Sequence, residues 1–271
     1  MRVGFIGLGS QGGPMARRIV EGGYETTLWA RRPASLEPFA DTAAKVAESP
    51  AELAAASDLV CLCVVADADV DEVTRGERGV LAAMKPGSVI AIHSTVHPNT
   101  CRELAKRAGA QGVSVVDAPV SGGGPAAAEG RLMVMTGGDA DVVERCRAVF
   151  ETYGDPVVHL GELGSGQTTK LLNNLLFSAH LATAATTLSL ASALGVDPDR
   201  LAEVVSRGSG NSFALNALGG IGGLERLAGV AGTLLQKDVR LVADLADRAG
   251  ASGGAVLDAA DAALALMGHP R

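Results

Sequence analysis

The sequence predicts an α/β protein: a Rossmann-like, doubly wound sheet, then a long interdomain helix and an all-α C-terminal domain. Three observations predict this architecture. Short apolar runs alternate with helical patterns in the first half, a glycine-rich motif follows the first run, and an uninterrupted helical pattern precedes a second half without a convincing strand. Strands that alternate with helices at this spacing indicate βαβ units and a mostly parallel sheet.

The first half supplies the elements of the predicted sheet. The strand candidates are Arg2–Ile6, Thr26–Trp29, Leu59–Val65, Ser88–His93, Ser114–Asp117 and Arg131–Thr136, and the run Pro156–Leu160 completes this half. The helical patterns between them are Pro14–Glu21, Ala51–Ala56, Val70–Arg75 and Thr100–Ala108. Alternation places Cys61 and Cys63 on one strand face, so we expect buried thiols and a reducing compartment.

The second half begins with a helical pattern from Gln167 to Leu194 that has no Gly, no Pro and one formally charged residue, Lys170. A helix of this length spans about 42 Å, enough to bridge two domains. Gly195, Asp197 and Pro198 then provide a C-cap, an N-cap and a first helical residue. Further helical patterns are Arg200–Ser206, Thr233–Arg248 and Ala255–Met267. We therefore expect a dinucleotide-binding domain at 1–162, an interdomain helix at 163–194 and an all-helical domain at 195–271.

Composition excludes several classes of partner. The 271 residues carry 23 Lys and Arg against 30 Asp and Glu, a net charge of −7, and only 3% of residues are aromatic. This balance argues against nucleic acid and against an anionic membrane surface. The sequence contains no run of about 18 uncharged apolar residues, so we expect no membrane span. The first strand candidate follows Met1 directly, without a leader-like segment, so we expect a cytoplasmic protein.

The motif after the first strand candidate is Gly7-Leu8-Gly9-Ser10-Gln11-Gly12. A GxGxxG sequence between a strand and a helix is the fingerprint of a dinucleotide site. Its glycines allow the tight turn, the approach of the pyrophosphate and close helix–strand packing, and the helix N-terminus faces the phosphate charge. We assign all six residues to cofactor binding, together with Val64 and Val65 at the end of the third strand candidate.

The segment after the second strand candidate indicates which cofactor binds. NAD-specific sites usually carry an acidic residue there, whereas this chain has Ala30, Arg31 and Arg32. A planar guanidinium suits a 2′-phosphate, so the sequence favours NADP(H), with NAD(H) still possible. The alternative is a solvated arginine pair in a surface loop.

Two later segments carry candidate substrate chemistry. Ser121 is followed by Gly122, Gly123 and Gly124 after a strand, and successive glycines allow backbone N–H groups to converge on an anion. The alternative is a flexible loop. In the long helix, Lys170 and Asn174 are four residues apart and therefore share a face. A lysine that faces a cleft suits general acid/base catalysis, whereas a solvated lysine does nothing.

The combination of these motifs resembles the β-hydroxyacid dehydrogenases, the group of 3-hydroxyisobutyrate dehydrogenase and the semialdehyde reductases. The resemblance runs from Val3 to about Gly250 and covers the glycine motif, the segments Asp117–Gly123 and Gly161–Asn174, and the pair Lys237 and Asp238. It implies the following roles: Lys170 as catalytic acid/base; Ser121, Gly122, Gly123 and Asn174 at the substrate; Thr95 beside nicotinamide and substrate; and Lys237 over the cofactor, positioned with Asp238.

The resemblance implies an NADP(H)-preferring oxidoreductase that interconverts a small β-hydroxyacid and its semialdehyde, acting as a homodimer or homotetramer. His93 departs from the family pattern, because an acid or amide is frequent before the Ser-Thr pair. Two alternatives stay open: an imine reductase, which usually lacks a lysine at the position of Lys170, and a nucleotide-binding module without catalysis. His93 and His97 have no third ligand nearby in the sequence, so we expect no metal site.

Overall fold

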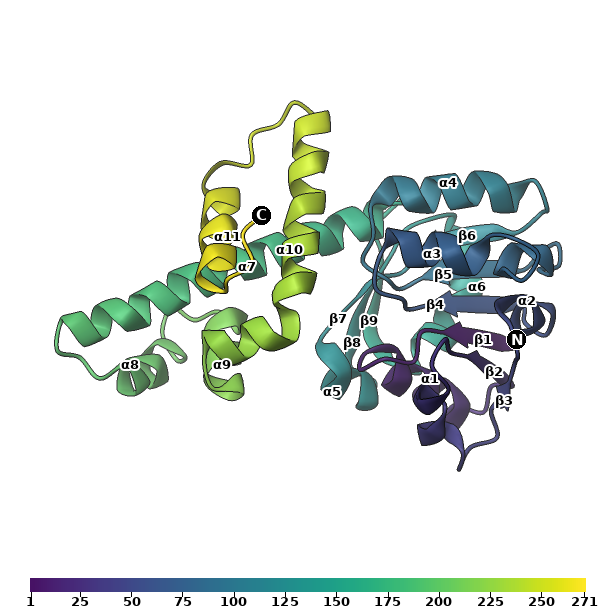
Figure 1. The fold of residues 1–271 in the computed structure, drawn as a ribbon, viewed down its shortest axis with the longest axis horizontal. Helices are drawn as coiled ribbons and strands as arrows, with labels where there is room; N and C mark the ends of the chain where they lie inside the picture. The colour runs from purple at the N-terminus through teal and green to yellow at the C-terminus, as the bar shows by residue number, and fades with distance from the viewer. The chain divides into compact units, whose positions relative to one another are not determined.

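The computed structural model describes residues 1–271, which form two compact units, Met1–Lys170 and Leu171–Arg271. The first unit contains all the strands, and the second contains only helices (Figure 1). The helices and strands of the first unit are β1 (Val3–Ile6), α1 (Gly12–Glu21), β2 (Thr26–Trp29), η1 (Pro33–Ser35), η2 (Glu37–Phe39), β3 (Lys45–Val46), α2 (Pro50–Ala55), β4 (Leu59–Leu62), α3 (Asp67–Thr74), η3 (Val80–Ala82), β5 (Val89–Ile92), α4 (Pro98–Gly109), β6 (Ser114–Asp117), β7 (Val120–Ser121), α5 (Gly123–Ala128), β8 (Leu132–Thr136), α6 (Ala140–Phe150) and β9 (Gly154–His159).

The main sheet of the first unit is parallel and has the strand order β3-β2-β1-β4-β5-β6. Its order reverses between β1 and β4, and ligands bind at the carboxyl ends of strands at such a reversal. Alternate residues face opposite sides of the sheet: Phe5 packs with α1, α5 and α6, and Ile6 packs with α2, α3 and α4. In Figure 1, α3 and α4 lie on one side of this sheet and α1 on the other. The sheet and the helical second unit confirm the predicted fold class.

The sequence pattern suggested that β8 and β9 continue the main sheet. They instead form a second sheet in the order β7-β8-β9. The chain leaves the main sheet after β6 at Ala118-Pro119. Proline has no N–H to donate to a ladder, and the Pro119 carbonyl instead accepts a hydrogen bond from Met135 N at 2.9 Å. The β7 strand then pairs antiparallel with β8, which places Ser121 of the predicted substrate segment opposite Met133.

The second unit is built on α7 (Ser165–Ala193), which begins in the first unit, and on α8 (Pro198–Val205), α9 (Phe213–Ile221), α10 (Leu224–Arg248) and α11 (Gly254–Leu266). Sequence patterning missed α9 and started α10 at Thr233, because Gly229 and Gly232 interrupt the pattern. At Gly232 the reason is tertiary: a Cβ there would lie 2.3 Å from His269 Cδ2 of the C-terminal segment.

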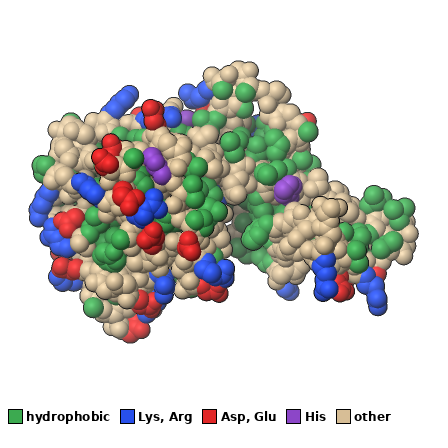
Figure 2. All heavy atoms as spheres, turned by 180° about the vertical axis from the view of Figure 1, so that it is seen from behind, with side chains coloured by type: hydrophobic (Ala, Val, Ile, Leu, Met, Phe, Trp, Pro, Cys, Tyr) green, Lys and Arg blue, Asp and Glu red, His purple; other side chains and the backbone are tan.

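One face of α7 enters the core of the second unit through Leu171, Leu175 and Leu181. The helix is long and apolar enough to cross a membrane by length and composition, which is weak evidence because core helices of soluble proteins pass the same test. On the face in Figure 2, charges of both signs cover the first unit, whereas the second unit shows mostly apolar and uncharged side chains. On this face the second unit therefore carries fewer charged side chains than the first.

Candidate active site

The glycine motif forms the loop between β1 and α1. Gly7 has a φ of +100°, and a Cβ there would lie 2.2 Å from the Cys63 carbonyl oxygen. A Cβ at Gly12 would lie 2.0 Å from the Gly7 oxygen, whereas no protein atom lies within 4 Å of a Cβ position at Gly9. Gly7 and Gly12 are thus required by packing, and Gly9 leaves its backbone open. No acidic residue lies in the first turn of α1, so the loop and helix end fit a pyrophosphate.

The arginine pair follows the end of β2 but is not equally placed. Arg31 forms ion pairs with Asp69 at 3.2 Å and Glu72 at 3.3 Å, both on α3. Its side chain is 65% exposed, so the guanidinium also faces solvent. The backbone of Arg32 is extended and leads into η1, and its side chain forms no ion pair. Sequence reasoning missed Asp69 and Glu72 because they lie about 40 residues away along the chain.

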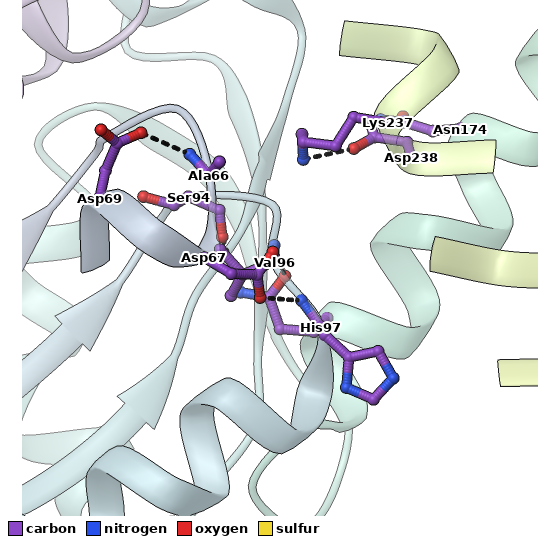
Figure 3. Close-up of polar contacts among 10 residues, drawn as sticks. Ala66, Asp67, Asp69, Ser94, Val96, His97, Asn174, Lys237 and Asp238 are labelled. Carbon is purple, nitrogen blue, oxygen red and sulfur yellow. Dashed lines mark hydrogen bonds and ion pairs between the residues drawn. The ribbon is translucent and has the colours of Figure 1, made fainter. Parts of the chain in front are cut away.

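The ends of β4 and β5 are joined by side-chain hydrogen bonds. The Ser94 hydroxyl accepts a hydrogen bond from Val64 N at 2.8 Å, and Val65 is exposed beside it. Asp67 accepts a hydrogen bond from His97 N at 2.8 Å (Figure 3). It accepts a second one from the Thr100 hydroxyl at 2.6 Å. These bonds fix the loop that carries Thr95 at the carboxyl end of the sheet.

His93 is a buried part of the same strand end, and no metal-ligand group surrounds it. Its Nδ1–H donates to the Ala118 carbonyl at 2.7 Å, and the Tyr153 hydroxyl donates to its Nε2 at 3.2 Å. Burial lowers the pKa of His93 to about 4, so the ring is neutral at physiological pH. In the sequence, His93 departs from the family pattern. In the structure, its hydrogen bond to Ala118 connects the end of β5 with the segment before β7.

The candidate substrate segment turns at its glycines. Gly122 and Gly123 have φ values of +133° and +77°, which side chains rarely adopt. A Cβ at Gly124 would lie 2.5 Å from the Ser10 carbonyl oxygen. The third glycine therefore allows the substrate segment, beginning at Ser121, to pack directly against the glycine motif of α1. The two sites assigned separately from sequence are thus neighbours.

The start of α7 is bonded to the ends of β5 and β6. The Asp117 carboxylate is fully buried and accepts hydrogen bonds from Gly164 N and Gln167 N, each at 2.7 Å. Burial raises the pKa of Asp117, and the two N–H groups oppose that shift. Lys170 lies one turn further along α7 and is 8% exposed. A buried lysine after a capped first turn is a position suited to proton transfer.

In the second unit, Asp238 contacts two of the predicted site residues, Asn174 and Lys237. Its carboxylate accepts a hydrogen bond from Asn174 Nδ2 at 2.6 Å and pairs with Lys237 Nζ at 2.7 Å (Figure 3). Asp238 is only 4% exposed. The sequence linked Asp238 to Lys237 as its neighbour, but the bond to Asn174 crosses 64 residues and was not foreseen.

Two family profiles match the chain. Residues 2–161 match the NAD binding domain of 6-phosphogluconate dehydrogenase, and residues 164–268 match the NAD-binding domain of NADP-dependent 3-hydroxyisobutyrate dehydrogenase. Together they extend over both compact units.

Curated relatives align with most of the chain. The chain is 39% identical to an uncharacterized oxidoreductase of Mycobacterium tuberculosis over 75% of this chain and 69% of the relative. It is 34% identical to mitochondrial 3-hydroxyisobutyrate dehydrogenase of Mus musculus, over 90% of this chain and 75% of the relative.

Solved structures agree with these matches. Mycobacterium tuberculosis 3-hydroxyisobutyrate dehydrogenase, solved with L-serine, has a TM-score of 0.85 at 28% identity and covers 99% of this chain and 95% of its own. Psf3 in complex with NADP+ and 2-OPP has a TM-score of 0.86 at 26% identity, covering 98% and 93%. An imine reductase from Pseudomonas sp. has a TM-score of 0.67 at 20% identity, covering 99% and 95%, which shows a shared fold only.

Proposed function

Because the chain belongs to the 3-hydroxyisobutyrate dehydrogenase family and is an NAD(P)-binding oxidoreductase, we propose that it interconverts a small β-hydroxyacid and its semialdehyde, with NADP(H) preferred. The single observation that carries the proposal is Lys170, a buried lysine on a helix whose first turn is bonded to the cofactor-side strands. The relative solved with L-serine supports the substrate class, since L-serine is itself a small β-hydroxyacid.

The preference for NADP(H) rests on the segment after β2. Ala30 offers no carboxylate to a ribose 2′-hydroxyl, and Arg31 and Arg32 provide cations for a 2′-phosphate. Asp69 and Glu72 hold the Arg31 guanidinium at the α3 side while leaving it largely exposed. The match to an NADP-dependent dehydrogenase domain and the neighbour bound to NADP+ support the same choice.

The bound nicotinamide supplies or accepts the hydride, and the protein residues place the substrate and move the proton. Ser121, Gly122 and Gly123 hold the substrate carboxylate through a hydroxyl and backbone N–H groups. Asn174, oriented by Asp238, hydrogen-bonds the substrate. Lys170 donates a proton to the developing alkoxide during reduction, and its neutral form accepts the hydroxyl proton during oxidation.

Lys170 also separates this proposal from its alternatives. An imine reductase of this architecture usually lacks the lysine, and a non-catalytic module has no need of one. The buried position of Lys170 near capped backbone therefore favours the hydroxyacid reaction.

The proposal is tested by identifying a substrate and then removing Lys170. Purified protein is screened with NADPH and NADH against glyoxylate, succinic, tartronate and methylmalonate semialdehydes. With the best substrate, Lys170→Ala is expected to bind NADPH normally but to lose about 10²–10⁴-fold in single-turnover hydride transfer. Lys170→Arg is expected to be nearly as slow, because a guanidinium stays protonated. Lys106→Ala, an exposed lysine on α4, serves as the control. Wild-type hydride transfer in Lys170→Ala would contradict the mechanism.

A further inference from the structure

The side-chain amide of Gln167 is buried and hydrogen-bonds the backbone of one loop that is distant in the sequence. Its Oε1 accepts a hydrogen bond from Val96 N at 3.0 Å, and its Nε2 donates to the Ser94 carbonyl oxygen at 2.8 Å. Gln167 is fully buried, and these partners lie 71 and 73 residues away along the chain. The carboxamide thus bonds the backbone on both sides of Thr95.

The backbone of Gln167 is held as well. Its N–H donates to Asp117 at 2.7 Å, and the same carboxylate accepts from Gly164 N. The first turn of α7 is therefore bonded to the ends of two neighbouring strands, β5 through the Gln167 side chain and β6 through Asp117. Lys170 follows three residues later, about 4.5 Å along the helix axis.

We propose that Gln167 is a positioning residue that sets the distance between Thr95, beside the nicotinamide, and Lys170, the proton donor. The inference rests on the proposed function of those two residues. Ser94, held from the other side by Val64 N, is kept at the strand end, but its hydrogen bond to Gln167 is what connects it to α7. If the two Gln167 side-chain bonds are lost, the loop that carries Thr95 is no longer hydrogen-bonded to α7 through Gln167, and a misplacement of about 1 Å costs about 100-fold in rate.

Two substitutions separate positioning from packing. Gln167→Met keeps the length and volume but removes both hydrogen bonds. Gln167→Glu keeps the acceptor for Val96 N but turns a second oxygen toward the Ser94 carbonyl. When ionised, that carboxylate repels the carbonyl; when protonated, it donates to it and restores the pattern. The variant is therefore expected to regain activity as the pH falls, unlike the wild type.

The charged and titratable groups around this position define how the pH response is read. They are Asp117 on β6, Lys170 on α7, Asp67 on α3, Arg102 and Cys101 on α4, His93 after β5 and His97 before α4. All are present in wild type, so the response that belongs to the introduced carboxyl is the difference between Gln167→Glu and wild type. Burial and the adjacent Asp117 carboxylate both raise the pKa of the introduced group toward neutrality.

The first measurement needs no substrate. Amide hydrogen exchange at Val96 in the cofactor-free protein is expected to accelerate in Gln167→Met, because Val96 N–H loses its acceptor, and to stay at the wild-type rate in Thr168→Ala. Thr168 is a suitable control because its hydroxyl bonds only within the same turn, to the Gly164 carbonyl. Unchanged Val96 exchange in Gln167→Met would overturn the proposed connection.

The second measurement is single-turnover hydride transfer at several pH values. Gln167→Met is expected to lose about 10- to 100-fold at every pH, and Gln167→Glu to lose as much near pH 8 and regain it on acidification, with NADPH affinity unchanged in both. Wild-type rates in both variants would overturn the positioning role. If either variant does not fold, Gln167→Asn, one methylene too short, takes its place with the same expected loss. Lys170→Ala measured in parallel distinguishes the two failures. Wild-type hydride transfer in Lys170→Ala would contradict the proposed function. A slow Lys170→Ala together with wild-type rates in the Gln167 variants would contradict this inference alone.

Discussion

At the scale of single residues, the proposed preference for NADP(H) depends on Arg31, whose guanidinium pairs with two carboxylates and also faces solvent. Asp69 and Glu72 restrict its side chain, so binding a 2′-phosphate costs less conformational entropy than it would for a free arginine. The same carboxylates would repel a 2′-phosphate, so the proposed preference requires the Arg31 guanidinium to lie next to that phosphate.

We expect Arg31→Ala to weaken NADPH binding by about 1.5–3 kcal/mol, the usual range for a hydrogen bond to a charged group, and to leave NADH binding unchanged. Trp29 is the only tryptophan and ends β2, so its fluorescence reports cofactor titration directly. Arg75→Ala, which removes an exposed arginine paired with Asp71, is the control. Equal NADPH affinity in wild type and Arg31→Ala would remove the arginine from the site.

His93 predicts a dependence of stability on pH. Its folded pKa of about 4 lies below the ordinary value near 6.5. Between these values the unfolded chain binds a proton that the folded protein does not, so the free energy of unfolding falls as the pH is lowered. The group accounts for a loss of about 3 kcal/mol across that window.

We therefore expect His93→Gln to be less stable than wild type at pH 7, because the bonds to Ala118 and Tyr153 are altered, but to lose less stability on acidification to pH 4. Urea unfolding at pH 7, 5.5 and 4 measures this difference. The control, His180→Gln on α7, is expected to keep the wild-type slope. A slope in His93→Gln equal to that of wild type would show that the imidazole titrates normally.

At the scale of elements, α7 serves two purposes along its length. Its first turn is polar and is hydrogen-bonded to the strand ends through Gln167 and Asp117, and the remainder packs Leu171, Leu175 and Leu181 into a helical core. The same helix leaves Leu190 57% exposed, and Leu194, directly after the helix end, is 71% exposed. Exposed apolar surface on successive turns is typical of a face that binds another protein.

We propose that this face binds a second copy of the chain, in a homodimer or homotetramer. Leu190 and Leu194 are one turn apart, so Leu190→Glu combined with Leu194→Glu places two charges on that face. Light scattering after gel filtration is expected to give a multiple of the 27.3 kDa chain mass for wild type and a smaller assembly for the double variant. Ser189→Glu, an exposed polar position on the same helix, is expected to keep the wild-type mass. A monomeric wild-type protein would rule the assembly out.

At the scale of the whole molecule, the residues with proposed roles belong to both compact units. The glycine motif, the substrate segment and Lys170 belong to the first, and the Asn174–Asp238–Lys237 group belongs to the second. A buried carboxylate holds part of each group: Asp117 bonds the start of α7 in the first unit, and Asp238 bonds Asn174 and Lys237 in the second. A buried carboxylate that accepts several hydrogen bonds fixes its donors in place.

The sequence alone was sufficient for the features that depend on neighbouring residues. The GxGxxG spacing, the apolar strands, the long uncharged helix and the pair Lys170 and Asn174 all follow from local periodicity and backbone freedom. Local periodicity also failed in identifiable places: glycines concealed the start of α10, and Pro119 redirected the chain into the second sheet.

Only the tertiary structure decided which residues hold these features in position. Asp69 beside Arg31, Asp117 at the start of α7, Gln167 across Thr95 and Asp238 beside Asn174 join residues that are about 40 to 70 positions apart. Such contacts leave no periodic signal, because they depend on how strands are ordered in a sheet and how helices pack against one another. The chemical groups were therefore readable from the sequence, whereas their partners depended on the folded arrangement of the strands and helices.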